Sequence, residues 1–514
     1  MRLSQRRRQP AAILALVVAS LTEIGAAETA SPPPAPAAAP ALEVSISEVV
    51  LLALESNPEI ALERYRPELA RSFALEEQAV FDPLVVADDL GWQRSEGEKL
   101  RGQGIIETFS TDSPVGRLAL ESFLPSGTGL ALEASTEVSD ESQDRQLVQS
   151  RIGLSVSQAL LRGLGPDTNQ ARVRAARIDA QISEYELRGF TEGFVALVEQ
   201  TCWDYALYRR KMEILDEATL LAEQQIRDTE TRVRVGTSAR VELAAPRSEL
   251  SLRNQERIDA RSSAEKTRLQ LLRLLGPTTP EAWSRQVRLT DTLRAADTSL
   301  EDAAAQLALA VRMRPDLNQA RLLAARGELE IVRTKNGLLP RLDFFASFGR
   351  SGYADSFSAS WSTLDGDYYD AFAGLRFEFP IRRSAARAQH QRAVAEKAQA
   401  DKGIENLRQL VEMDVLSARL EVERARDQIV ASSQTRQLDE EKLAAEIEKF
   451  RIGRASAFQV ARAQRDLTRS RLAEATALAE AQKALVEMHR LDGSLLSRRG
   501  IAAPGASPFP ASGR

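Results

Sequence analysis

Apolar and polar residues alternate in several short segments of the chain. The clearest is residues 373–379, which read AGLRFEF; residues 152–157 (IGLSVS) alternate in the same way, and residues 342–348 alternate less regularly. Because successive side chains of a strand point to opposite faces, each segment predicts a strand with one apolar face. A membrane-spanning barrel and a half-buried sheet of a water-soluble domain both give this pattern. Eleven of the 27 aromatic residues lie between Phe344 and Phe379, which favours the barrel, because aromatic residues gather at its membrane interfaces.

Helical periodicity dominates the remaining sequence. Apolar residues at helical spacing predict a helix at about 45–79 and another at about 299–336. Pro58 and Pro315 are expected to interrupt or kink these two helices, because proline removes a backbone donor.

Two much longer helices follow the predicted strands. Residues 167–234 and 384–451 contain no proline, and 68 helical residues span roughly 100 Å. After glycine turns, shorter helices return over about 239–275 and 456–491. The two short helices of each half can therefore stack end to end along one long helix, as in an antiparallel coiled coil.

An internal repeat organises these elements. Residues 57–60 (NPEI) resemble residues 314–317 (RPDL), 257 positions later, and the same offset relates Pro83 to Pro340. The chain therefore consists of two tandem copies of one unit.

The second half of the unit repeats at a different offset. Residues 234–236 (RVG) resemble residues 451–453 (RIG), 217 positions later. The two offsets differ by 40, so the first copy carries an insertion of about that length between Pro83 and its long helix. Residues 117–123 and 130–138 alternate around a Pro-Ser-Gly-Thr-Gly turn and predict an extra hairpin there.

The N-terminus has the features of an export signal. Residues 1–27 combine four arginines, an apolar run of eleven residues and a Gly-Ala-Ala site, which predicts a signal peptide, with an N-terminal anchor as the alternative. A Pro/Ala-rich linker occupies 28–44. The predicted domains are the first repeat (45–276, with the extra hairpin near 115–140), a connecting segment (277–298), the second repeat (299–493) and a tail (494–514).

Composition excludes several functions. The net charge of −5 gives no electrostatic case for nucleic acid, and one cysteine, Cys202, cannot form a disulfide within the chain. His390 and His489 lie on predicted helices without metal-ligand spacing, so no metal, cofactor or catalytic set is predicted. Acidic residues beside arginines at helical spacing are expected to be mostly surface pairs.

The pattern as a whole resembles the TolC-type outer-membrane efflux family. The resemblance is carried by residues 53–58 and 314–317, the prolines before the strands, and the turn sequences VGT (235–237) and IGR (452–454), and it covers about residues 42–495. It implies a mainly α chain with membrane β strands. A homotrimer would form a twelve-stranded outer-membrane β-barrel, with four strands per chain, continued by a long α-helical coiled-coil barrel in the periplasm. The extra hairpin would either enlarge this barrel to six strands per chain or lie outside it as a loop.

The resemblance also implies partners and sites. A periplasmic adaptor protein would bind the helix turns and connect the channel to an inner-membrane pump, with outer-membrane lipid around the barrel. The adaptor-binding residues would be Val235, Gly236, Thr237, Ile452, Gly453 and Arg454. A tight helix–helix turn explains the same residues without a partner.

A pore constriction is expected beyond the turns. Family members carry acidic residues six and nine positions after the second glycine, where this chain has Gln459 and Arg462. A mixed gate of Glu242, Arg454, Gln459 and Arg462 is therefore our prediction, with solvated surface charges as the alternative. The leading function is a passive export channel of a tripartite efflux or type I secretion system. A periplasmic or surface coiled-coil protein without a pore is the alternative, and an enzyme is the weakest interpretation.

Overall fold

The computed structural model describes residues 42–101, 105–139, 147–295, 300, 302–502 and 505. The predicted signal peptide and residues 28–41 of the predicted linker lie outside the described residues. The last linker residues form strand β1 (Leu42–Val44), which pairs in parallel with β6 (Val287–Leu289) of the connecting segment.

Each repeat begins with a helix pair divided at the predicted proline. The first pair is α1 (Ile46–Ser56) and α2 (Pro58–Gln78), and the second is α6 (Ala303–Met313) and α7 (Pro315–Asn336). The proline begins the second helix of each pair, where its missing N–H has no helical partner to lose. Ser45 starts α1 with a capping box to Glu48, which satisfies two further backbone donors.

The predicted long helices are present. α4 (Ala171–Arg234) has 64 residues and α9 (Ser384–Arg451) has 68, and the returning helices are α5 (Ala244–Leu274) and α10 (Ala457–Leu491). Short helices complete the chain: η1 (Ala79–Phe81), α3 (Pro166–Asn169), η2 (Arg240–Leu243), η3 (Pro280–Ser284), α8 (Phe357–Ser362) and α11 (Leu495–Arg498).

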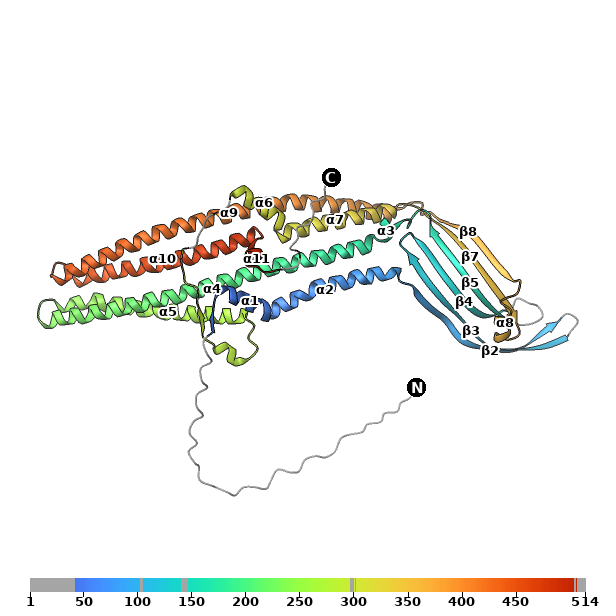
Figure 1. Ribbon diagram of the computed structural model, residues 1–514, viewed down its shortest axis with the longest axis horizontal. Coiled ribbons are helices and arrows are strands. Elements are labelled where there is room, and N and C mark those ends of the chain that lie inside the picture. Colours follow the sequence, from blue (N-terminus) through green and yellow to red (C-terminus); the bar gives the residue numbers. More distant parts are fainter. Residues whose placement is uncertain are drawn as a thin grey trace, which may run out of the picture. The chain divides into compact units, whose positions relative to one another are not determined.

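The helices form four rods that lie side by side. As predicted from their lengths, two short helices stack end to end beside each long helix. α2 and α5 both pack along α4, whereas α7 and α10 pack between α4 and α9. The lateral order is therefore α2/α5, α4, α7/α10 and α9, and Figure 1 shows the short helices following one another along the long ones.

Six antiparallel strands form one sheet at one end of the rods (Figure 1). In spatial order they are β2 (Leu84–Arg101), β3 (Ile105–Leu124), β4 (Thr128–Ser139), β5 (Leu147–Ala159), β7 (Arg341–Ala354) and β8 (Tyr369–Glu378). The predicted extra hairpin is β3–β4, and it lies inside the sheet. The expectation of four strands per chain is therefore wrong, because β3 pairs with β2 and β4 pairs with β5.

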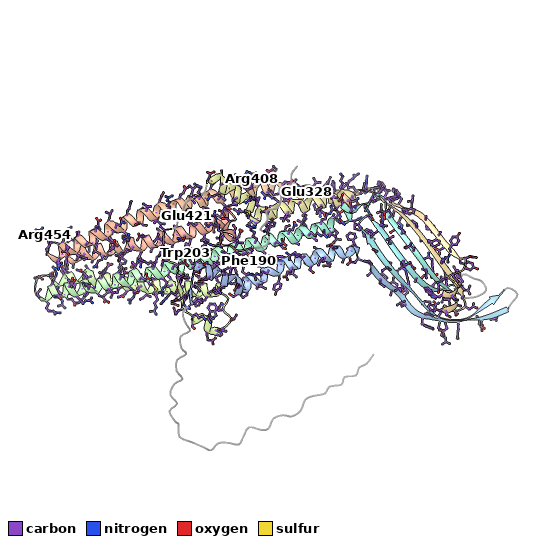
Figure 2. The ribbon with its side chains drawn as sticks, in the orientation of Figure 1. Phe190, Trp203, Glu328, Arg408, Glu421 and Arg454 are labelled. Carbon is purple, nitrogen blue, oxygen red and sulfur yellow. The ribbon has the colours of Figure 1, made fainter. Side chains whose placement is uncertain are left out.

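The main hydrophobic core lies halfway along the rods, where β1, β6 and α11 cover α1, α4 and α5. Its fully buried side chains include Val49, Val195, Leu271 and Leu495. Phe190 and Trp203 of α4 pack against this core (Figure 2). Cys202 lies within it, and burial raises the pKa of its thiol well above the ordinary value. No helix in the described part of the chain is long and apolar enough to cross a membrane.

Candidate functional site

Two glycine turns lie at the end of the rods remote from the sheet (Figure 1). At the end of α4, Gly236 has φ of 77°, its N–H donates to the carbonyl of Val233 at 3.2 Å, and the Thr237 N–H donates to that of Arg232 at 2.9 Å. This pair of bonds is a Schellman motif, which requires a left-handed residue at its centre. The sequence therefore ends the helix with glycine, for which that conformation costs least.

The second repeat ends α9 in the same way. Gly453 has φ of 76° and donates to Phe450 at 3.1 Å, and the Arg454 N–H donates to the carbonyl of Lys449 at 2.8 Å. Figure 2 shows Arg454 at this end of the rods. The preceding residues, Val235 and Ile452, are each 66% exposed. Both turns thus combine an exposed aliphatic side chain with an uncovered glycine, a surface that a partner's backbone can approach closely.

The first repeat holds the second at this end through two contacts. The guanidinium of Arg232 lies 4.2 Å from the centre of the Phe450 ring and donates to the carbonyl of Arg451 at 3.1 Å. The carboxylate of Glu242 accepts from the backbone N–H of Ala457 at 3.3 Å, at the start of α10. A carboxylate at a helix N-terminus also interacts favourably with the helix dipole. Sequence reasoning missed Arg232 and Phe450, because no local pattern indicates a contact across 218 residues.

The predicted gate residues gather around the same helix N-terminus. Gln459 forms a capping box with Ser456, its side-chain oxygen accepting from the Ser456 N–H at 2.8 Å. Glu242 binds the intervening residue, Ala457. Arg462 follows Gln459 by about one helical turn and, like Arg454, is exposed. Two of the four side chains thus cap the start of α10, and the two arginines are exposed.

A buried network of ion pairs joins α5 and α10 a few helical turns away from the glycine turns. Glu249 of α5 is 1% exposed, accepts from Arg253 of the same helix, and pairs with Arg465 of α10 at 3.0 Å. Arg253 is also buried and pairs with Glu256 at 2.5 Å. This i, i+4 pair is an exception to the expectation that such pairs lie mostly on the surface, because α10 covers one side of α5. Spacing alone cannot distinguish this buried pair from the exposed ones.

A second buried pair lies near the main core. Arg188 donates to Glu192 at 3.0 Å and to the carbonyls of Gly493 and Gly505 at 3.1 and 2.8 Å. Burial raises the pKa of Glu192, although the Arg188 bond opposes the shift. Arg188 thus connects α4 of the first repeat to the end of α10, and it fixes how the two repeats pack.

The charged side chains that pair between strands lie on one face of the sheet, which also carries Phe345 and Phe372. On this face, Arg117 pairs with Asp88 at 3.5 Å, Glu121 at 3.5 Å and Glu133 at 3.1 Å, which connects β2, β3 and β4. Arg151 of the same face crosses β7 and pairs with Asp370 of β8 at 2.6 Å. This face lines a hollow of about 970 Å³, which indicates that it is the concave, water-facing side.

The opposite face carries the apolar side chains. On β8 these are Tyr369, Ala371, Ala373, Leu375 and Phe377, with an aromatic residue at each end. The nine residues from Tyr369 to Phe377 span about 26 Å along the strand, enough to cross most of the apolar band of an outer-membrane barrel. The alternation predicted from residues 373–379 is confirmed, with Arg376 and Glu378 on the charged face.

In the described residues, no group of three or more His, Cys, Asp or Glu side chains could hold a metal ion. The Nδ1 atom of His390 lies 3.1 Å from the Thr334 hydroxyl. This contact joins α7 to α9, which is a structural role.

Comparisons with known proteins agree with this geometry. The family model described as outer membrane efflux protein matches residues 117–277 and 306–494, one segment in each repeat. No curated protein matches the chain. Among solved structures, CusC is 15% identical, with a TM-score of 0.64 over 88% of this chain and 93% of that chain.

Two further channels are similar to a comparable degree. The CmeC outer membrane channel of Campylobacter jejuni is 16% identical, with a TM-score of 0.62 over 88% of this chain and 86% of that chain. The MtrE outer membrane channel of Neisseria gonorrhoeae, solved in its open state, is 15% identical, with a TM-score of 0.62 over 88% of this chain and 89% of that chain. At these identities the likeness shows a common fold.

Proposed function

The chain belongs to the outer membrane efflux protein family, and on this premise we propose that three copies form the passive exit duct of a tripartite efflux or type I secretion system. It is an outer-membrane channel with a periplasmic helical domain. The observation that carries the proposal is a sheet with one apolar and one charged face, joined to helices of 64 and 68 residues. A charged lumen and a lipid-facing exterior require these two faces.

The sheet of one chain supports assembly from several copies. β2 and β8 are its edges, and an edge in lipid leaves backbone groups without hydrogen-bond partners, at several kcal/mol each. The strands alternate in direction, so β8 of one copy would meet β2 of the next in antiparallel orientation. Closure of a ring of copies removes every edge.

The helices support the same assembly. α2 exposes Leu62, Tyr65, Leu69 and Phe73, which lie opposite the buried face containing Ile60 and Ala74. At the other side of the rods, α9 exposes Met413, Leu416 and Leu420 opposite its buried residues. Large apolar stripes on both lateral helices are what neighbouring copies would cover.

A passive duct cannot itself drive export, so we assign the energy source to an inner-membrane pump. A periplasmic adaptor would dock at the two glycine turns, contacting Val235, Gly236 and Thr237 in one repeat and Ile452, Gly453 and Arg454 in the other. The open space around both glycines supports this assignment, because a Cβ there would meet no atom within 4 Å. Glu242, Arg454, Gln459 and Arg462 would form the gate at the same end.

Assembly and conduction provide the test. Material extracted with detergent from the outer membrane should migrate as a trimer before heating and as a monomer after it. The trimer should conduct ions in planar bilayers. A coiled-coil protein without a pore would leave the membrane without detergent and would give no conductance, and either result would overturn the proposal.

The gate has its own test. Arg462→Asp should shift the ion selectivity of the trimer toward cations, because a ring of like charges selects by electrostatics. Arg451→Asp makes the same charge change at the exposed end of α9, outside the proposed gate, and should alter selectivity less. Equal selectivity in both variants and the wild type would remove these residues from the gate.

A further inference from the structure

We infer that the inserted hairpin β3–β4 is part of the membrane wall, so that the assembled channel crosses the outer membrane as an eighteen-stranded barrel. The inference rests on the proposed trimer: three copies of the six-stranded sheet make eighteen strands. The resemblance alone implies twelve. The inserted hairpin would therefore change the width of the exit without changing the helical tunnel.

The pairing of the strands leaves the hairpin no place outside the wall. β3 pairs with β2 from Ile105 to Glu121, and β4 pairs with β5 along its whole length, from Thr128 to Ser139. β2 and β5 are not neighbours in the sheet; the hairpin lies between them. The connectivity identifies β3–β4 as the addition, because β2 and β5 take the places that β7 and β8 take in the second repeat.

The lipid-facing surface runs across the hairpin without interruption. One row of mutually paired residues crosses all six strands and is wholly apolar: Val85, Leu120, Leu132, Leu154, Phe348 and Ala371. Leu120 and Leu132, which the hairpin contributes, are 46% and 50% exposed, close to the 50% of Leu154 on β5. A hairpin outside the membrane would have no reason to continue this row.

The charged face is equally continuous. Ala131 lies between Leu130 and Leu132 of β4, points to the charged face and lines the hollow on that side. Arg117 of β3 holds Asp88 of β2 and Glu133 of β4 on the same face. The hairpin therefore contributes lumen-facing as well as lipid-facing residues.

The width of the rods agrees with six strands. Four rods at 8–10 Å between axes cover about 32–40 Å of wall. Six strands about 4.8 Å apart, tilted by about 40°, cover about 38 Å, whereas four would cover about 25 Å. The additional hairpin thus makes the sheet as wide as the helices that support it.

A wider barrel has a consequence for transport. Barrel diameter grows about linearly with strand number, so eighteen strands give a diameter about 1.5 times that of twelve. The outer-membrane end would then admit cargo too bulky for a twelve-stranded ring. Size selection would fall to the helix turns at the other end of the channel.

Electron cryomicroscopy of the purified channel tests the strand number directly. We expect eighteen strands in the wild-type trimer. In a variant lacking residues 105–139, β2 and β5 become neighbours, and we expect twelve strands and a diameter smaller by about 1.5-fold. A wild-type trimer with a twelve-stranded wall and the hairpin outside would overturn the inference while leaving the proposed function intact. Absence of a trimer would instead overturn the proposed function.

Cysteine labelling keeps the inference testable if the deletion variant does not fold. Cys202, the one cysteine of the chain, is buried, so the native chain should react little with maleimides. In membranes, Leu120→Cys and Leu132→Cys should be protected from a water-soluble maleimide and labelled by a lipid-soluble one. Ala131→Cys, one residue from Leu132 on the charged face, should show the opposite preference. Equal labelling of all three by the water-soluble reagent would place the hairpin outside the wall.

Discussion

At the scale of single residues, the buried Glu249–Arg253 pair should be sensitive to substitution. Glu249→Ala should lower the free energy of unfolding by about 3–5 kcal/mol, because it leaves the buried guanidinium of Arg253 without its main partner. Glu230→Ala removes an exposed pair with Arg247 at 3.1 Å and should cost less than about 1 kcal/mol. Thermal unfolding followed by circular dichroism compares the two, and similar losses would contradict the assignment.

Acid should weaken a partly exposed ion cluster between three helices. Arg471 of α10 donates to Glu440 of α9 at 3.0 Å and pairs with Glu217 of α4 at 3.1 Å, and its bond to Glu440 lowers the pKa of that carboxyl. The ionised pair therefore stabilises the fold above the ordinary pKa of 4.5, and this stability is lost as pH falls through the lowered pKa.

The variant Glu440→Gln tests this pH dependence. At pH 7 it should be less stable than the wild type by under about 1 kcal/mol, since solvent screens the pair. As pH falls below 4.5, the two melting temperatures should converge. Glu441→Gln, the exposed neighbour, should match the wild type throughout. A difference for Glu440→Gln that persists undiminished at pH 3 would exclude the ion pair as its cause.

The role of a single residue can be predicted from the sequence only where the local backbone geometry determines that role. Gly236 and Gly453 were predicted to form the turns after the long helices, and both have positive φ. The burial of the Glu249–Arg253 pair could not be predicted, because it depends on α10, which begins more than 200 residues later in the chain. The roles of Glu242, Arg454, Gln459 and Arg462 in conduction stay predictions, since a gate forms only between copies.

At the scale of elements, a glycine inside α9 and one in the turn that ends it should respond to alanine with opposite signs. Gly453→Ala should destabilise the fold by about 1–2 kcal/mol, because φ of 76° is strained for any side chain. Gly403→Ala, in the interior of the same helix and with no atom within 4 Å of the added Cβ, should stabilise it by about 0.5–1 kcal/mol. Equilibrium unfolding in denaturant measures both, and a stabilised Gly453→Ala variant would contradict the Schellman assignment.

Element lengths are predicted well when proline and glycine delimit them. The proline-free stretch 384–451 coincides with α9, because nothing inside it interrupts helical hydrogen bonding. The predicted hairpin at 117–138 is shorter than β3 and β4, which begin at Ile105 and end at Ser139. The outer half of β3 reads ETFSTDSP, without alternation, and is a strand only because β2 pairs with it.

At the scale of the whole molecule, the sequence did not decide whether the inserted hairpin joins the sheet or lies outside it as a loop. The strand pairing places it in the sheet. The repeat offsets predict an insertion of about 40 residues, and alternation predicts a hairpin, but both would suit a loop outside the sheet. The position of β3–β4 between β2 and β5 depends on pairing between strands that are distant in the sequence, and local composition does not indicate such pairing. The family's strand number could not be transferred to this chain for that reason.

The exposed apolar stripe on α2 predicts which substitutions should prevent trimer assembly. Leu69 and Phe73 of α2 are 60% and 63% exposed in one chain and lie where a neighbouring copy's helix would cover them. Burying such side chains contributes about 1.5–3 kcal/mol each, and a buried unpaired carboxylate costs several more. Leu69→Glu combined with Phe73→Glu should therefore abolish the trimer that survives in unheated detergent samples.

The folded chain itself should survive this change, because both side chains lie opposite the face that packs on α4. Helical circular dichroism should stay at the wild-type value while light scattering reports a monomer. Glu68→Lys, a quarter turn from the stripe, reverses a charge on the same helix and should leave the trimer intact. An intact trimer in the double variant would show that α2 faces solvent in the assembly, and neighbouring copies would then have to meet through another surface.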